Sequence, residues 1–340
     1  MSKLAVFYSE DFLGHKAPPY HPENENRLIS IHKAFEKVDF YDAEIFEPRA
    51  ANLKELELIH TKEHIENVKR ASETSGYLDP DTYTSPGSYN AALKAAGSLM
   101  QATQLIQEKE LSRAFCLLRP PGHHALANQA MGFCLFNNAA LGAAWLVHNH
   151  NKKVAILDFD AHHGNGTQSI FFESDKVLYC SWHQWPHYPG TGWLDEVGQG
   201  SGRGYTINIP LPEGSADDIL IKSLDEIVIP VLKQFEPSLI IVSAGFDSHK
   251  DDPLSSLLFS ESGYAAFTSR LIKQNGKLAN GIIYCLEGGY DLDSLQKSAL
   301  KSFAVLADKE VEITLGESKP ETVSIEKVKE SVKEFWNLNK

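Results

Sequence analysis

The sequence predicts an α/β protein built on a mostly parallel sheet. Short runs rich in β-branched residues recur along the chain, and most are apolar throughout, as expected for strands buried on both faces. Helical patterns separate several of these runs, and such alternation is typical of a parallel sheet covered by helices. No change of composition and no internal repeat divides the 340 residues, so we expect a single domain, residues 1–340.

The expected elements alternate along the chain. Apolar runs define the strands, and helical patterns define the helices between them. We expect the core to span about residues 4–305, and in the tail, 306–340, the amphipathic stretch 324–338 is expected to form a closing helix. In chain order we expect strand 4–8, helices 27–37, 53–72 and 88–109, strand 114–118, helix 138–149, strands 154–159, 177–182 and 205–211, helix 216–235, strand 239–246, helix 262–275 and strand 281–287.

Composition and charge exclude several classes of protein. Hydrophobic residues make up 42% of the chain and charged residues 23%, which excludes a disordered or collagen-like protein. Apolar runs such as 239–246 are far shorter than the roughly 18 residues of a membrane-spanning helix, so we expect no membrane span. The net charge of −13 repels phosphate backbones and anionic lipids, so we expect no direct nucleic-acid binding and a preference for cationic molecules or basic peptides.

The N-terminus and the cysteines predict a cytoplasmic protein. Residues 1–3 lead directly into an apolar run, without the basic and long apolar regions of a signal peptide. The four cysteines are far apart, which favours small core residues over a disulfide framework or a thiolate zinc site. These cysteines are Cys116, Cys134, Cys180 and Cys285.

Side chains that can carry chemistry follow four of the expected strands. In open parallel sheets, ligands bind at the carboxyl ends of the strands, so these side chains are expected to meet. Eight of the 14 histidines fall in the stretch from His123 to His187, which an even scatter does not explain. The residues at these strand ends are His123 and His124, then Asp158, Asp160 and His162, then Asp247, and finally Tyr290.

Three of these residues suit a catalytic metal. Asp160 and His162 alternate in an extended segment, so their side chains point the same way, and Asp247 after another strand is a suitable third ligand. Two carboxylates and one imidazole leave positions open for water and substrate, as in hydrolytic metal sites. The alternative is that they are polar residues at strand ends that cap the following helices.

The histidine pair and the tyrosine suit acid-base chemistry. Two adjacent imidazoles cannot both be protonated cheaply in a cleft of low dielectric, so one of His123 and His124 can act as a base while the other gives electrostatic support. Tyr290 follows two glycines that allow a tight turn, and its phenol could donate to an oxyanion. The alternatives are an exposed histidine pair in a loop and a turn with a packed ring.

Six segments of the chain carry a family resemblance. They are 119–125 (RPPGHHA), 132–138 (GFCLFNN), 158–168 (DFDAHHGNGTQ), 188–192 (YPGTG), 243–248 (SAGFDS) and 286–290 (LEGGY). In this order they resemble the zinc-dependent histone deacetylases and their relatives, the acetylpolyamine amidohydrolases, over most of the chain. The resemblance implies the arginase/deacetylase fold, with about eight strands in a mostly parallel sheet flanked by helices.

The resemblance also implies the metal sites. It implies one catalytic zinc ion bound by Asp160, His162 and Asp247. It further implies structural potassium, whose inner site maps to Asp158, Asp160, His162, Ser181 and Trp182 and whose outer site maps to Phe171, Ser174, Val177 and Tyr205.

The resemblance assigns catalytic roles at the other strand ends. His124 would be the general base and then the acid to the leaving amine, while His123, oriented by Asp158, would give electrostatic support. Tyr290 would hydrogen-bond the carbonyl oxygen and the tetrahedral oxyanion. These roles imply hydrolysis of an acetamide by water.

The resemblance further implies a narrow tunnel for an acyl-lysine side chain. Phe133 and Tyr188 would form its aromatic walls, with Gly132 and Leu254 also at the substrate. Arg27 matches an arginine that lines an internal cavity behind the metal.

One position departs from the class I pattern of the family. Class I enzymes have an aspartate where this chain has Asn165, so the partner of His124 is neutral. The chain therefore looks like a class II enzyme or its bacterial relatives. Tyr290 is retained where some class II members have histidine, so the oxyanion donor is present.

Two classes of function follow from the resemblance. The first is an amidohydrolase that removes acetyl, or another short acyl group, from acetyl-lysine in proteins or peptides, with acetylpolyamines as the alternative substrates. Leu254 favours lysine substrates, because the polyamine-selective member has a glutamate there, and the few residues between His15 and His21 leave little room for a loop that narrows the site. The second class is a catalytically weak module that binds acyl-lysine.

Overall fold

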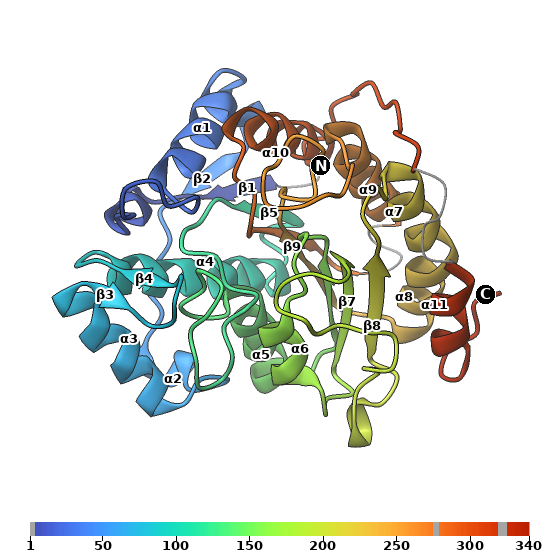
Figure 1. Cartoon of the computed structure of the whole chain (residues 1–340), viewed down its shortest axis with the longest axis horizontal. Coiled ribbons are helices and arrows are strands. Elements are labelled where there is room, and N and C mark those ends of the chain that lie inside the picture. Colours follow the sequence, from blue (N-terminus) through green and yellow to red (C-terminus); the bar gives the residue numbers. More distant parts are fainter. Residues whose placement is uncertain (1–3, 275–278, 319–324, 340) are drawn as a thin grey trace.

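The computed structural model describes residues 4–274, 279–318 and 325–339. Within these ranges, eight parallel strands form one sheet in the order β2-β1-β5-β10-β9-β6-β7-β8 (Figure 1). The predicted α/β fold with a parallel sheet of eight strands is confirmed. The strands are β1 (Leu4–Phe7), β2 (Glu44–Phe46), β5 (Arg113–Cys116), β6 (Val154–Asp158), β7 (Val177–Gln184), β8 (Thr206–Leu211), β9 (Leu239–Ala244) and β10 (Ile282–Leu286).

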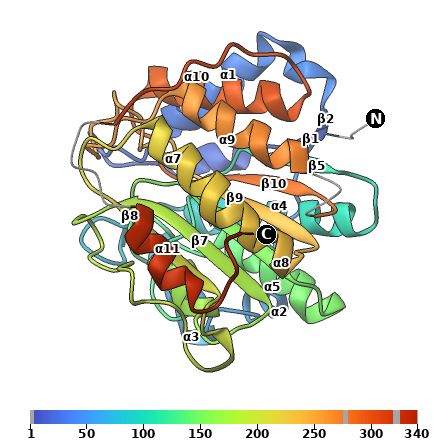
Figure 2. The same ribbon diagram turned by 90° about the vertical axis from the view of Figure 1, so that its right-hand side faces the viewer.

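Helices cover both faces of the sheet (Figures 1 and 2). On one face α1 packs on α10, α10 on α9, and α9 on α7, while on the other face α4 packs on α5 and α3, and α5 on α6 and α2. None of the helices in the described ranges is both long enough and apolar enough to cross a membrane. The helices are α1 (Glu25–Glu36), α2 (Leu53–Leu56), α3 (Lys62–Thr74), α4 (Ser88–Gln107), α5 (Asn138–His150), α6 (Asn165–Phe171), α7 (Asp217–Ser223), α8 (Ile229–Phe235), α9 (Glu261–Gln274) and α10 (Leu292–Leu306).

The core explains why the strand sequences are apolar throughout. Every residue of β6, β9 and β10 is buried, because helices cover these central strands from both sides. Burying apolar surface contributes roughly 25 cal/mol per Å², so such strands are favoured only inside a covered sheet. The four cysteines are buried and free, as predicted.

Two predicted helices are divided in the structure. The expected helix 53–72 is α2 and α3, because Thr61 caps a new helix by accepting a hydrogen bond from the backbone N–H of His64. The expected helix 216–235 is α7 and α8, joined by a π-helical turn, η4 (Leu224–Val228). Pro230 lacks the N–H that a regular α-helix needs at this point, which accounts for the wider turn.

Several elements were not in the prediction. Strand β2 has three residues, two of them exposed, so it lacks the apolar run that marks the central strands. Helices α6 and α10 were also missed. The small elements are the hairpin of β3 (Gly76–Tyr77) and β4 (Tyr83–Thr84), and the 3-10 turns η1 (Glu10–Gly14), η2 (Asp39–Asp42) and η3 (Gly200–Gly202).

The C-terminal tail ends in a helix that covers the sheet edge. Helix α11 (Ile325–Lys333) is shorter than the predicted 324–338, whose first residue lies outside the described residues, as does the last residue of the predicted helix 262–275. Figure 2 shows α11 alongside β8, the last strand of the sheet. It buries Val328 and Val332, and Trp336 then donates a hydrogen bond of 2.7 Å to the Gly204 carbonyl.

Candidate active site

The strand order brings the predicted site residues to one edge of the sheet. Strands β5, β10, β9 and β6 are consecutive neighbours, and all run in the same direction. Their carboxyl ends therefore lie side by side, so residues far apart in sequence meet there. β5 leads to His123 and His124, β10 to Tyr290, β9 to Asp247, and β6 to Asp158, Asp160 and His162.

Asp160, His162 and Asp247 form a compact cluster at this edge. One ligand atom from each residue lies within 4.8 Å of the other two. The Nδ1 atom of His162 lies 3.1 Å from Asp160 Oδ1 and 3.0 Å from Asp247 Oδ2. Both carboxylates are almost completely buried. The geometry thus places two carboxylates and one imidazole around a single point.

Backbone groups hold the outer sides of these carboxylates. The N–H of Gly288 donates to Asp160 Oδ2 and the N–H of Ala161 donates to Asp247 Oδ1, each at 2.8 Å. Gly288 must be glycine here, since a Cβ atom would lie 2.2 Å from Asp247 Oδ2 and 2.6 Å from Asp160 Oδ2. Such supporting bonds orient ligand side chains in metal sites.

The electrostatics of the cluster fit a divalent metal. Burial and the neighbouring charge of Asp160 raise the pKa of Asp247 above its ordinary value, so the two carboxylates need a cation between them. Burial alone would lower the pKa of His162, but the hydrogen bonds and charges of the two aspartates raise it to about 10. A metal would replace the proton held there. Nitrogen and oxygen donors with positions left open match a catalytic zinc site.

His123 is paired with a buried carboxylate. Its Nδ1 atom lies 3.1 Å from Asp158 Oδ2, and Asp158 also accepts a 3.0 Å bond from the Tyr179 hydroxyl. Burial opposes the charged form of His123, but the charges of Asp160 and Asp158 raise its pKa to about 10. These two carboxylates therefore favour the protonated form of His123.

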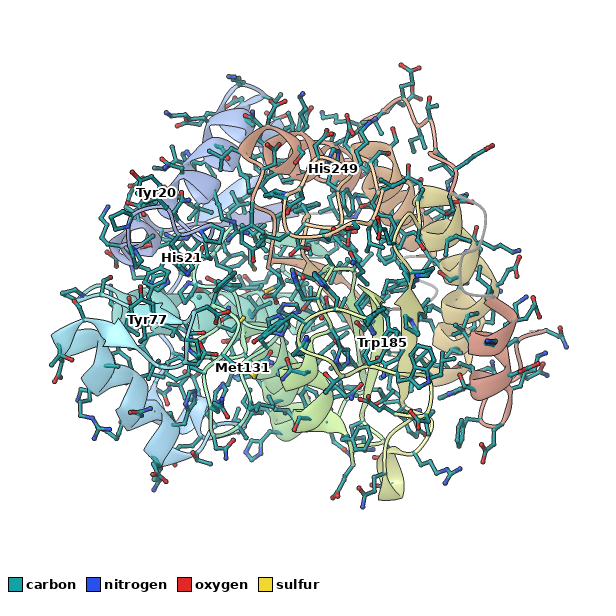
Figure 3. All side chains as sticks on the ribbon, in the orientation of Figure 1. Tyr20, His21, Tyr77, Met131, Trp185 and His249 are labelled. Carbon is teal, nitrogen blue, oxygen red and sulfur yellow. The ribbon has the colours of Figure 1, made fainter. Side chains whose placement is uncertain are left out.

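His124 is held as a neutral base. Burial lowers its pKa well below the ordinary value, and the charges of His123 and His162 lower it further. Its Nδ1 atom lies 2.8 Å from Asn165 Oδ1, while Asn165 Nδ2 donates to the Met131 sulfur at 3.3 Å. Because the amide nitrogen is engaged there, its oxygen faces His124, which places the proton on Nδ1 and leaves Nε2 free. Met131 is labelled in Figure 3, below His21 and to the left of Trp185.

Tyr290 borders the same space. Burial raises the pKa of its phenol well above the ordinary value, and the nearby Arg27 guanidinium only partly offsets this. The phenol is therefore a proton donor at neutral pH. The Arg27 guanidinium carbon lies 4.9 Å from the centre of the Tyr290 ring.

A cavity of about 240 Å³ leads to this cluster. Tyr188 lies edge-on to His124, with ring centres 5.2 Å apart, and Phe133 lies edge-on to Tyr290 at 5.9 Å. Gly132 has φ +55°, and a Cβ atom there would lie 2.4 Å from the His124 ring. The lining residues are Asp81, His124, Gly132, Phe133, His162, His187, Tyr188, Leu254 and Tyr290.

Comparison with known proteins identifies the family. The histone deacetylase domain matches residues 21–306, which is most of the chain. The chain belongs to the histone deacetylase family. A probable deacetylase of Archaeoglobus fulgidus is 40% identical over 292 residues, covering 85% of this chain and 81% of that protein. The chloroplastic histone deacetylase 10 of Oryza sativa subsp. japonica is 35% identical over 321 residues, covering 88% of this chain and 72% of that protein.

A solved structure of this family has the same fold. The crystal structure of the HDA15 HD domain superimposes with a TM-score of 0.89 at 35% identity, covering 98% of this chain and 95% of that domain. The deacetylase fold expected from the sequence is therefore confirmed. The family consists of deacetylases, which are hydrolases.

Arg27 of this histone deacetylase family member lies behind the tyrosine. It is completely buried and donates hydrogen bonds to the carbonyls of Glu287 and Gly289. It also donates to Glu23 at 2.9 Å, and Arg119 donates to the same carboxylate at 2.7 Å. Burial alone would raise the pKa of Glu23, but Arg119 and Arg27 hold it well below its ordinary value. This buried network fixes the back of the Tyr290 turn.

The residues predicted to bind potassium at the inner site include two members of the Asp160, His162 and Asp247 cluster and three residues of β6 and β7. Asp158 and Ser181 are paired across β6 and β7, and Trp182 follows within β7. The Ser181 hydroxyl lies 2.9 Å from His183 Nδ1. The carbonyls of Phe171 and Tyr205, from the predicted outer site, accept backbone hydrogen bonds from Ser174 and Tyr179.

Three residues near the deacetylase-family site were missed from the sequence. Asp81 and His187 line the cavity. Glu287 is completely buried and accepts hydrogen bonds from the N–H groups of Gly122 and His123, at 2.7 and 3.2 Å. The segments YPGTG and LEGGY could have pointed to the adjacent His187 and to Glu287 itself. Asp81 lies in the turn between β3 and β4, where no sequence pattern marks it.

Proposed function

We propose that this protein is a metal-dependent amidohydrolase that removes acetyl, or another short acyl group, from the side chain of acetyl-lysine in proteins or peptides. One observation carries the proposal. The cluster of Asp160, His162 and Asp247 meets the cavity at His162, and the same cavity is lined by His124, whose pKa is lowered, and by Tyr290, whose pKa is raised.

The metal is proposed as zinc, held by Asp160, His162 and Asp247. When bound, zinc supplies an activated water and polarises the substrate carbonyl. Potassium is proposed beside it, because the carboxylate of Asp158 and the hydroxyl of Ser181 offer oxygen donors on paired strands. Potassium would stabilise this part of the sheet edge.

His124 is proposed to move the proton. Its free Nε2 atom can accept a proton from the attacking water and then deliver it to the amine nitrogen as the amide C–N bond breaks. The products are a carboxylate and a free amine. The cation at His123, paired with Asp158, lowers the cost of negative charge developing beside it.

Tyr290 is proposed to stabilise the oxyanion. Its phenol is a donor over the whole neutral range, because burial raises its pKa. A donor that faces the carbonyl oxygen strengthens its bond as negative charge grows there, which favours the transition state over the substrate.

The cavity favours a substrate with a slender alkyl chain. Phe133 and Tyr188 present flat rings along it, and Leu254 adds an apolar wall. Asp81 adds one carboxylate, which could accept an N–H from a peptide backbone or attract a cationic amine. The alternative substrates are therefore acetylpolyamines. The apolar character of Leu254 leads us to favour acetyl-lysine.

A module that only binds acyl-lysine is the second candidate. It would share the cavity, but it would need neither His124 as a proton acceptor nor Tyr290 as a hydrogen-bond donor. Because both states are present, we favour the enzyme.

Four buried free cysteines suit a reducing compartment, so we place the protein in the cytoplasm.

A substrate panel tests the proposal. Zinc-loaded protein is assayed side by side on acetyl-lysine peptides, on peptides with longer acyl groups and on N-acetylpolyamines, with release of free amine as the readout. We expect turnover of acetyl-lysine peptides that a chelator abolishes. Tight binding without turnover on every substrate would favour the binding module instead.

A further inference from the structure

A buried carboxylate near the cavity is engaged entirely by backbone groups. Asp252 is 5% exposed and lies in the turn after β9. Its Oδ2 atom accepts the N–H groups of Tyr290 at 2.6 Å and of Asp291 at 3.1 Å. Its Oδ1 atom accepts the N–H of Leu254 at 3.0 Å. One side chain thus joins two segments that border the cavity.

The first of these segments is the apolar wall. The N–H of Leu254 is held by Asp252, and its carbonyl accepts a 2.9 Å hydrogen bond from His187 Nε2. The adjacent Ser255 hydroxyl donates to the carbonyl of Asp247 at 2.6 Å. Both backbone polar groups of Leu254, its N–H and its carbonyl, are therefore hydrogen-bonded to side chains. The turn that carries it starts near His249, labelled in Figure 3.

The second segment is the tyrosine turn. Gly289 has φ +118°, a conformation that residues other than glycine rarely adopt. On one side of the turn Gly288 donates to Asp160, and on the other Tyr290 donates to Asp252. The backbone of the turn that carries the phenol is thus hydrogen-bonded to Asp160, a proposed metal ligand, on one side and to Asp252 on the other.

We propose that Asp252 is a positioning residue, which fixes the position of the Tyr290 phenol relative to the Leu254 side chain on the cavity wall. The proposal rests on the proposed function, in which Tyr290 meets the substrate carbonyl. A displacement of about 1 Å at such a group can cost about a hundredfold in rate. Asp252 itself touches neither substrate nor metal in this role.

The chemistry of the three donors requires a carboxylate. Both oxygens of an ionised carboxylate accept hydrogen bonds, and the three N–H donors favour this form. Burial and the charge of Asp247 oppose it and raise the pKa of Asp252 to about 7, so the full set of bonds forms above that pH. Asparagine has nearly the same shape but replaces one oxygen by an NH₂ group. In Asp252→Asn that NH₂ would face either the Leu254 N–H or the N–H groups of Tyr290 and Asp291. One half of the connection is lost whichever way the amide points.

Kinetics of two matched variants test the role. Asp252→Asn is compared with Asp251→Asn, which removes the same charge from a neighbouring side chain that is 62% exposed. For Asp252→Asn we expect kcat to fall by about tenfold or more, KM to change by less than about threefold, and zinc content to stay the same. Asp251→Asn should change neither constant by more than about twofold. Equal losses in the two variants, or unchanged kcat in Asp252→Asn, would overturn the proposal.

Amide hydrogen exchange gives a readout that does not depend on turnover. In the zinc-loaded wild-type protein, the amides of Leu254, Tyr290 and Asp291 should be protected, and Asp252→Asn should accelerate exchange in one or both segments. Rapid exchange at Tyr290 and Asp291 in the wild type would overturn the proposal even if the variant failed to fold. If the wild type turned over no acyl amine, the proposed function would fail, while the exchange rates would still decide whether Asp252 fixes these segments.

Discussion

The Nδ1 atom of His124 lies 2.8 Å from the Oδ1 atom of Asn165, so this imidazole is bonded to a neutral amide. The adjacent His123 is instead bonded to the Asp158 carboxylate. The surroundings of these two adjacent side chains favour opposite states. Despite burial, the charges of Asp160 and Asp158 raise the pKa of His123 and favour its protonated form, while burial and the charges of His123 and His162 lower the pKa of His124 and favour its neutral form. A division of this kind between paired groups separates acid-base roles in active sites.

The first prediction concerns the base. His124→Ala should lower kcat by about a hundredfold or more, the range for removing a general base, with a smaller effect on KM. Single-turnover assays on zinc-loaded protein measure the step directly. His148→Ala, in the last turn of α5, serves as the control and should leave kcat unchanged. A His124→Ala variant with near-normal turnover would remove this residue from proton transfer.

The second prediction concerns the oxyanion donor. Tyr290→Phe keeps the ring that packs against Phe133 and Arg27 but removes the hydroxyl. We expect kcat to fall by about a hundredfold or more, because one oxyanion donor is lost, while the metal content and the melting temperature stay near those of the wild type. If turnover is normal at full metal occupancy, the phenol is not the donor.

The third prediction concerns the metal. Asp247→Ala should lose bound zinc while keeping the fold, since two of the three clustered ligands cannot hold a catalytic ion tightly. Elemental analysis measures occupancy, and circular dichroism checks the fold. In the wild type, chelation should abolish hydrolysis, and added zinc should restore it. Full occupancy in Asp247→Ala would exclude this carboxylate from the ligand set.

The sequence was sufficient to predict most of the cluster for a physical reason. Runs such as those of β6 and β9 are apolar throughout, which identifies buried parallel strands. Neighbouring parallel strands end at one edge, so the polar residues that follow them are brought together without any knowledge of the loops. Asp160, His162 and Asp247 were found in this way, and the resemblance to a family then suggested their roles.

Other features depend on packing between distant segments. Asp81 reaches the cavity from a small hairpin between α3 and α4, and Asp252 finds its partners across 38 and 39 positions of sequence. No local pattern encodes such contacts. The edge strand β2 was missed because two of its three residues are exposed, which removes the apolar pattern. The break before α3 depends on a cap at Thr61 that interrupts an otherwise helical pattern.

The fourth prediction concerns substrate choice. We expect a higher kcat/KM for acetyl-lysine peptides than for N8-acetylspermidine, because Leu254 supplies no charge to the cavity wall. Leu254→Glu should raise the relative kcat/KM of the polyamine, since a carboxylate in contact attracts a cationic chain far more than a net charge screened over about 8 Å. In the wild type, Asp81 is a carboxylate that lines the cavity. Asp81→Asn should therefore lower kcat/KM for N8-acetylspermidine below the wild-type value. A tenfold preference of the wild type for the polyamine would contradict this assignment.

A buried histidine, His60, holds the loop that carries Phe133. His60 is 3% exposed, its Nδ1 atom lies 3.0 Å from the Leu126 carbonyl, and its Nε2 atom accepts the Asn137 N–H at 2.9 Å. These two bonds close the segment between Leu126 and Asn137, which includes the cavity wall. Only a neutral imidazole can both donate and accept in this way.

The last prediction is that His60 makes the protein less stable in mild acid. Burial, with the charge of His64, lowers the pKa of His60 from 6.5 to about 3, so the unfolded chain binds a proton below pH 6.5 that the folded chain does not. The free energy of unfolding therefore falls by up to about 1.4 kcal/mol per pH unit between those values. His60→Gln offers the same donor and acceptor without titrating, so its loss of stability between pH 7 and pH 5 should be smaller by about 2 kcal/mol. Urea unfolding at both pH values measures the difference, and parallel pH dependence in the two proteins would show that His60 is protonated in the folded state.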